Sequence, residues 1–272
     1  MTQRGFKTQS IALLTLWRHS SLVFELVKRE FTGRYRGSFG GVFWSFVQPL
    51  FLLAVYTLAF GVILKMRWGF SGDTKDYAFM LFAGLIVFNA FAECLKRAPT
   101  LVTANPNFVK KVVFPLELLP LVMAIAAMAH ALISIAVWLA GYMLIFGVPK
   151  LTLFYFPVIL GVFFPVLLGV GWLLAALGVI VRDIDQLTGM VAHALLFLTP
   201  IFFSIDAAPG LLQHVLMANP LTFIVEQLRQ VMFVGIPPNF KGLAVYLVLA
   251  TAFSAASLLI FRRLRSSFAD LV

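Results

Sequence analysis

Charged residues are scarce in this sequence. Only 12% of its 272 residues are Asp, Glu, Lys or Arg, whereas 61% are hydrophobic. A soluble domain carries about a quarter charged residues, so an ordinary water-soluble globular protein is excluded. Cysteine is almost absent as well: Cys94 alone provides neither a disulfide framework nor a cysteine cluster for a metal.

Motifs for nucleotide binding and catalysis are missing. No Gly-x-x-x-x-Gly-Lys-Ser/Thr segment occurs, so the chain has no P-loop, and any ATPase that drives it is another polypeptide. The histidines are scattered, without an acidic residue at metal-ligand spacing; they are His19, His130, His193 and His214. We therefore expect no catalytic residue, no metal and no cofactor in this chain, and no enzyme activity of its own.

Acidic residues are also missing from the interior of the long apolar runs. Those nearest to them stand at their ends: Glu93, Glu117, Asp183, Asp185 and Asp206. Ion-driven transport usually needs acidic groups buried in the membrane, so proton or sodium coupling loses most of its support. A selective ion channel loses support too, although a filter of backbone carbonyl groups stays open as an alternative.

Long uncharged runs predict six transmembrane helices, since about 20 apolar residues cross a bilayer. These runs lie at about 42–64, 77–95, 118–147, 152–181, 186–205 and 242–261. A further run, within 206–240, is interrupted by Pro209, Gly210 and Pro220, which favours two short re-entrant helices on the outer side over another span. We predict an all-α polytopic membrane protein with a single transmembrane domain over 1–272.

The basic residues give an independent test of this topology. With six spans, 15 of the 21 Lys and Arg residues fall on one side of the membrane. The positive-inside rule makes that side cytoplasmic and places both termini there. The net charge of +10 is therefore explained by topology rather than by binding to nucleic acid.

The N-terminal segment 10–36 precedes the first span. Its residues 10–33 have one apolar and one basic face, which predicts an amphipathic helix in the membrane interface; a helix packed on a partner protein is the alternative. The stretch 28–41, which leads into the first span, combines four basic side chains with a Gly-rich hinge, and its candidate site residues are Lys28, Arg29, Arg34, Tyr35 and Arg36. Phosphate is the obvious ligand, from ordinary headgroups or a specific pyrophosphate, although membrane anchoring alone would also explain the charges.

A second specific segment is the loop 104–115 between the second and third spans. Asn105 can cap a short helix with Pro106 at its first position, and Pro115 would end it. A short basic helix in the cytoplasm suits docking into a cleft on another protein, and a simple connecting turn is the alternative. The candidate docking residues are Asn105, Pro106, Asn107, Phe108, Val109, Lys110 and Lys111.

Aromatic residues are abundant, with 29 Phe, 6 Tyr and 5 Trp. Lipid contact and interfacial belts explain most of them. Those deep in the predicted spans also suit a path for sugars, which stack on aromatic rings. The candidates are Tyr56, Phe60, Phe88, Phe91, Trp138, Tyr142 and Trp172.

Five motifs, in order along the chain, resemble one family. They are Glu25–Leu50 (ELVKREF-x-x-RYRGS-x-x-G-x-x-WS-x-x-x-PL), Phe108–Pro115 (FVKKVVFP), Arg182-Asp-Ile184, Leu198–Phe202 (LTPIF) and Asn219-Pro220. Over essentially the whole chain, the sequence resembles permease subunits of polysaccharide ABC exporters of the Wzm, TagG and KpsM type.

The resemblance implies a homodimer with a separate ATPase subunit, which holds ATP and Mg, beneath each permease. It implies a coupling helix at 105–112, a gate helix at about 25–36, and re-entrant helices around 211–218 and 223–233. The family exports lipid-linked glycans, such as O-antigen, capsule or teichoic acid, across the bacterial cytoplasmic (inner) membrane, and periplasmic or outer-membrane export components are further partners. A permease for a drug or lipid is the alternative, and a membrane-embedded acyltransferase or glycosyltransferase is less favoured.

Overall fold

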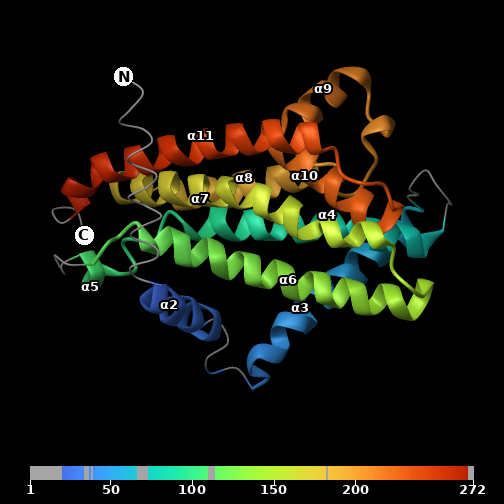
Figure 1. The fold of residues 1–272 in the computed structure, drawn as a ribbon, viewed down its shortest axis with the longest axis horizontal. Helices are drawn as coiled ribbons and strands as arrows, with labels where there is room; N and C mark the ends of the chain where they lie inside the picture. The colour runs from blue at the N-terminus through green and yellow to red at the C-terminus, as the bar shows by residue number, and fades with distance from the viewer. Residues whose placement is uncertain are drawn as a thin grey trace.

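The computed structural model describes residues 20–33, 37, 39–65, 73–109, 114–181 and 183–268, and every regular element among them is helical. The longer helices run side by side along the molecule (Figure 1). They are α2 (Ser20–Gly33), α3 (Trp44–Tyr56), α4 (Thr74–Arg97), α5 (Pro106–Val109), α6 (Leu118–Phe146), α7 (Phe156–Ile180), α8 (Ile184–Leu198), α9 (Gly210–Ala218), α10 (Pro220–Arg229) and α11 (Phe240–Leu264). Short 3-10 or π-helical segments adjoin them: η1 (Gly41–Phe43), η2 (Thr57–Ile63), η3 (Leu151–Tyr155), η4 (Ile205–Ala207), η5 (Gln230–Val234) and η6 (Arg265–Ser267).

Helix α4 forms the centre of the bundle. Its most apolar stretch is 83% buried, and it packs against α6, α7, α8 and α10. Asp73 caps its start by accepting a hydrogen bond from the backbone N–H of Lys75, and Lys96 and Arg97 occupy its last turn. An acidic residue at the start and basic residues at the end of a helix both stabilise it through the helix dipole. The local sequence and the burial of α4 therefore both favour a helix here.

Helix α7 approaches its neighbours closely through glycines. A Cβ on Gly169 would lie 2.5 Å from the ring of Phe253 in α11, the helix that packs along α7. A Cβ on Gly178 would collide with the backbone carbonyl group of Pro99, in the turn that follows α4. These glycines allow the contacts that small residues typically provide between membrane helices.

We predict that Gly178→Ala destabilises the chain by about 1–3 kcal/mol, because the Pro99 backbone must move to admit the methyl group. Gly161→Ala, in the same helix, is the matched control, since a Cβ there has nothing within 4 Å. Thermal unfolding of the purified variants in detergent measures both. Equal unfolding midpoints for the two variants would show that α7 and this turn are not in close contact.

Five helical stretches are long and apolar enough to cross a membrane: Trp44–Ile63, Thr74–Arg97, Leu118–Phe146, Leu151–Ile180 and Phe240–Ser267. They correspond to five of the six predicted spans. The predicted span 186–205 instead contains α8, a shorter apolar helix that ends at Leu198. Thr199 precedes Pro200 and is extended, as the ring of a following proline favours. Helix length therefore supports five spans, and the sixth stays a proposal.

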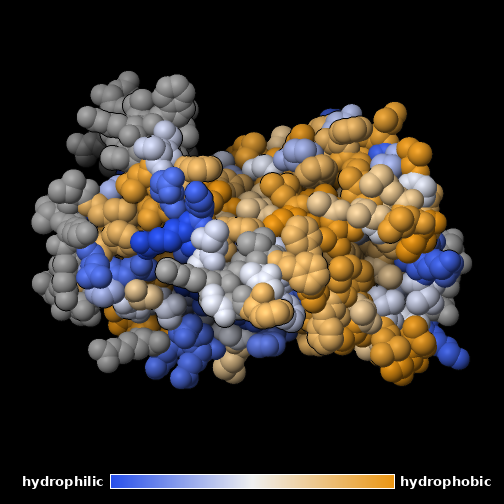
Figure 2. All heavy atoms as spheres, turned by 90° about the horizontal axis from the view of Figure 1, so that it is seen from below, coloured by the Kyte–Doolittle hydropathy of each residue, from blue (hydrophilic) through white to orange (hydrophobic). Residues whose placement is uncertain are grey.

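Apolar side chains cover much of the outside of the bundle. The stretch Trp44–Ile63 has only 6% of its most apolar part buried within the chain. Seen from the side of α2 and α3, hydrophobic residues cover most of the surface, while hydrophilic residues gather toward the end of the bundle where α2 lies (Figure 2). So large an apolar surface fits contact with lipid or with other membrane helices.

Candidate functional site

Helix α2 packs on α6 near the end of the bundle that also contains α5 (Figure 1). The Phe31 ring stacks on His130 of α6, with their ring centroids 4.9 Å apart. Glu30 forms an ion pair with Arg97 of α4. The second half of the predicted amphipathic helix is thus attached to the bundle at two points, whereas residues 10–19 lie outside the described residues.

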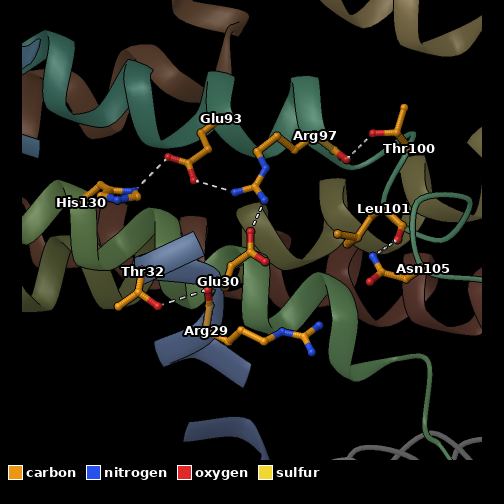
Figure 3. A network of polar contacts seen from close by, with 9 residues as sticks. All are labelled: Arg29, Glu30, Thr32, Glu93, Arg97, Thr100, Leu101, Asn105 and His130. Atoms are coloured by element: carbon orange, nitrogen blue, oxygen red, sulfur yellow. Dashed lines mark hydrogen bonds and ion pairs between the residues drawn. The ribbon is translucent and has the colours of Figure 1, made fainter. Parts of the chain in front are cut away.

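A charged cluster joins α2, α4 and α6, and we call Glu30, Glu93, Arg97 and His130 the Glu93 cluster (Figure 3). The Glu93 carboxylate, 12% exposed, accepts a hydrogen bond from Arg97 (3.4 Å) and lies 3.3 Å from Nδ1 of His130. Arg97 also reaches Glu30 on α2. These contacts link α2 to α4 and α4 to α6, so a movement of α2 would act on both of the other helices.

The loop after α4 contains the predicted docking helix, α5 (Pro106–Val109). The side chain of Asn105, predicted to cap it, donates a hydrogen bond to the carbonyl oxygen of Leu101 (2.9 Å; Figure 3). Asn107 is exposed, whereas Phe108 and Val109 are half-buried and pack against the core. The predicted docking residues Lys110 and Lys111 lie outside the described residues.

Phe108 connects the two segments that the sequence singles out. Its ring stacks on Phe114, with centroids 4.3 Å apart, and the Arg29 guanidinium of α2 lies 5.6 Å from its ring centroid. This cation–π contact attaches α2 directly to α5. Phe108 therefore faces its own chain, and Asn107 is the exposed residue of α5.

Glu117, at the end of the same loop, is held by the C-terminal segment. Its carboxylate accepts hydrogen bonds from Arg265 (3.2 Å) and lies 3.4 Å from Nε of Arg262, and its carbonyl oxygen accepts one from Trp172 (3.0 Å). Arg265 also donates to the carbonyl oxygen of Phe114 (3.2 Å). The loop that contains α5 is therefore fixed at its far end to α7 and α11.

The predicted glycan-path residues divide by burial. Phe88, Phe91, Trp138 and Tyr142 are buried within the chain, and the Trp138 indole N–H donates to the carbonyl oxygen of Phe79 (3.0 Å). Tyr56 and Phe60 are half-buried and pack on Phe202, with centroids 5.4 and 4.3 Å away. Trp172 is half-buried, and its indole N–H donates a hydrogen bond to the carbonyl oxygen of Glu117. Their role in a path stays a prediction.

Arg229, at the end of α10, is a fully buried cation that no sequence motif indicates. It donates hydrogen bonds to the carbonyl oxygens of Met80 (2.9 Å), Pro200 (2.6 Å) and Ile201 (2.8 Å), and to the Glu226 carboxylate (2.8 Å). The guanidinium group has five donors, which suits it to several acceptors at once. Arg229 thereby ties α10 to α4 and to the segment after α8.

The two last motifs of the sequence meet beside Arg229. The Asn219 side-chain amide donates to the carbonyl oxygen of Leu198 (3.1 Å) and to Oγ1 of Thr199 (3.0 Å), and its oxygen caps α10 at the N–H of Leu221. Tyr77 donates to the carbonyl oxygen of Phe202 (3.0 Å). The backbone carbonyl groups that have no partner within α8 where it ends thus accept hydrogen bonds from Tyr77 of α4, from Arg229 of α10 and from Asn219, which caps α10.

These features define a helical membrane protein in which the loop containing α5 and the helix α2 are joined at one end of the bundle. The model of the ABC-2 type transporter family matches residues 21–233, and the chain belongs to that family. Membership places it among the membrane subunits of transporters rather than among enzymes.

The chain is also similar to two permeases described as "O-antigen export system permease protein RfbA". It is 24% identical to the one from Myxococcus xanthus over 257 residues, which cover 94% of this chain and 96% of that one. It is 23% identical to one from Klebsiella pneumoniae over 253 residues, which cover 92% of this chain and 95% of the relative. These matches confirm the resemblance to permeases of polysaccharide ABC transporters.

Proposed function

We propose that this chain is the transmembrane subunit of an ATP-driven exporter that moves a lipid-linked polysaccharide, of the O-antigen, capsule or teichoic-acid type, across the bacterial cytoplasmic membrane. It works as a homodimer with a separate ATPase subunit, which binds ATP and Mg. The observation that carries the proposal is the similarity to O-antigen export permeases over nearly the full length of both chains.

In this proposal both termini are cytoplasmic, α8 is a sixth and shorter span, and the segment containing α9 and α10 is re-entrant at the outer face. The positive-inside distribution of the basic residues supports this orientation. The Arg229 and Asn219 hydrogen bonds support a packed rather than lipid-exposed position for the irregular backbone at 199–202.

The ATPase docks on the loop 104–115, with α5 as the coupling helix. The Arg29–Phe108 contact supports direct transmission from this helix to α2, which acts as the gate helix. The Arg265–Glu117 pair fixes the other end of the loop to η6, directly after α11. A displacement of α5 by ATP binding in the partner would then move α2 relative to the bundle.

The lipid pyrophosphate is held at the gate by the basic residues Lys28, Arg29, Arg34 and Arg36, together with Tyr35. Lys28 and Arg29 are exposed on α2, which leaves Lys28 open to an anion beside the membrane. Arg34, Tyr35 and Arg36 lie outside the described residues, and their part in the site rests on the sequence.

The test is surface polysaccharide in cells whose only copy of the chain carries Arg34→Glu and Arg36→Glu. We expect export to fall at least tenfold, toward the level of cells lacking the chain, because two charge reversals repel the pyrophosphate. The control is Lys75→Glu with Lys241→Glu. These are also two charge reversals, but they lie in the first turns of α4 and α11, which the proposed topology places on the outer side of the membrane. Normal export by the Arg34/Arg36 variant would contradict the pyrophosphate role.

A further inference from the structure

A cavity of about 430 Å³ lies between α3, α4 and α6, beside the Glu93 cluster. Much of its lining is polar, although all three helices are predicted spans. The polar lining includes Gln48 of α3, Asn89, Glu93 and Lys96 of α4, and His130 and Ser134 of α6. Its volume falls within the range of roughly 300–1,000 Å³ typical of small-molecule sites.

The polar groups of α4 extend from the end of the helix into the span. Asn89, Glu93 and Lys96 share one face because they are three or four residues apart. At 1.5 Å per residue, Asn89 is about 12 Å from Arg97 at the helix end, which is well inside a hydrocarbon core. Polar residues at such a depth are costly and usually mark a substrate path.

Two carboxamides in this cavity have unused hydrogen-bonding capacity. Asn89 is exposed although α4 is the most buried helix, and Gln48 is exposed on the facing helix α3. Within the part of the chain that the structure describes, neither side chain makes a hydrogen bond. A ligand that fills the cavity removes water from these amides, so a ligand that hydrogen-bonds to them is favoured over one that does not.

The chemistry of the lining selects among ligands. Each carboxamide offers two donors and one acceptor oxygen, which match sugar hydroxyl and acetamido groups, themselves donors and acceptors. The Glu93 carboxylate, which accepts a hydrogen bond from the Arg97 guanidinium, can also accept one from a sugar hydroxyl. An alkyl chain would leave both carboxamides without a partner, so the lining disfavours a plain lipid tail.

We infer that this cavity binds one sugar unit of the transported glycan, with Gln48 and Asn89 as its hydrogen-bonding residues and Glu93 as an acceptor. The inference rests on the proposed function, and it assigns sugar recognition to a polar pocket within one chain. It differs from the aromatic path predicted from sequence, because Phe88, Phe91, Trp138 and Tyr142 are covered by their own chain. The side chains of Gln48 and Asn89, by contrast, are exposed.

The experiment uses the purified full chain and two probes: undecaprenyl diphosphate carrying one N-acetylglucosamine, and undecaprenyl diphosphate alone. Their affinities are obtained from the rise in thermal unfolding midpoint with probe concentration. We expect the sugar-bearing probe to bind more tightly to the wild-type chain. Gln48→Met with Asn89→Leu, which keep the side-chain size, should lower that affinity roughly tenfold or more and leave binding of the sugar-free probe unchanged.

The control is Thr251→Val in α11, whose hydroxyl bonds only within its own helix, to the carbonyl oxygens of Leu247 and Val248. It should bind both probes as the wild type does. The inference is overturned if the wild type does not distinguish the probes, if neither probe binds, or if the double variant keeps its preference. Failure of the proposed function is separate: the wild-type chain would then neither co-purify with an ATPase nor support surface glycan, whatever the probes do.

Discussion

Replacing Arg229 with methionine is expected to lower the free energy of unfolding by about 3 kcal/mol or more, the largest stability effect of any single substitution considered. Methionine has a similar length but no donor, so the carbonyl groups of Met80, Pro200 and Ile201 lose a partner in a buried site. Each buried group left unpaired costs about 1–3 kcal/mol. Glu226 would also lose its counter-ion.

The measurement is the thermal unfolding midpoint of the purified variant in detergent, together with its level in the membrane. Arg263→Met is the matched control, because Arg263 is exposed near the end of α11 and should change the stability by about 0.5 kcal/mol or less. Arg229→Lys should fall between the two, since a single ammonium group cannot reach all the acceptors. Equal midpoints for Arg229→Met and Arg263→Met would contradict the anchoring role of Arg229.

The largest effect on activity is expected from Phe108→Asp, which should abolish export and co-purification with the ATPase. The substitution removes the ring that stacks on Phe114 and lies against Arg29, and it places a charge in a half-buried position. Helix α5 would then lose its fixed position for docking. Surface polysaccharide and the amount of ATPase retained on the tagged chain are the two readouts.

The control is Ser266→Asp, which introduces the same carboxylate at an exposed residue of η6, outside the loop 104–115. It should reduce export much less, because the packing of Phe108 is intact. Phe108→Leu, which keeps an apolar side chain, should retain part of the activity. If Phe108→Asp still co-purifies with the ATPase and supports transport, α5 is not the coupling helix.

Much of the membrane architecture is predictable from sequence, because uncharged runs of about 20 apolar residues are rare outside membrane spans. The five stretches long enough to span begin and end within about three residues of their predicted bounds, except that the last extends to Ser267, beyond the predicted end at 261. The predicted run 186–205 is the exception: hydropathy continues past Leu198, but Pro200 and the extended Thr199 end the helix there. Hydropathy alone does not show that the helix ends there. The backbone carbonyl groups after the break accept hydrogen bonds from Tyr77 and Arg229, which are far away in the sequence.

The packing of individual side chains is much less predictable. In the sequence Arg229 is simply a basic residue of an outer segment, yet one of its partners, Met80, is 149 positions away. The Arg265–Glu117 pair spans 148 positions. Where nearly every residue of a helix is apolar, periodicity cannot separate the lipid face from the packed face. The burial of Trp138 and Tyr142 is therefore visible only in the structure.

The central claim is that this chain forms a conduit for a lipid-linked glycan whose energy comes from a partner ATPase. Its most direct test is transport into proteoliposomes containing the chain and that ATPase, with the glycan detected by a glycan-specific probe confined to one side. We predict that ATP drives transfer, and that omitting ATP, the ATPase or this chain abolishes it. Transfer by the chain alone without ATP, or ATP-driven movement of a plain lipid but not of the glycan, would contradict the claim.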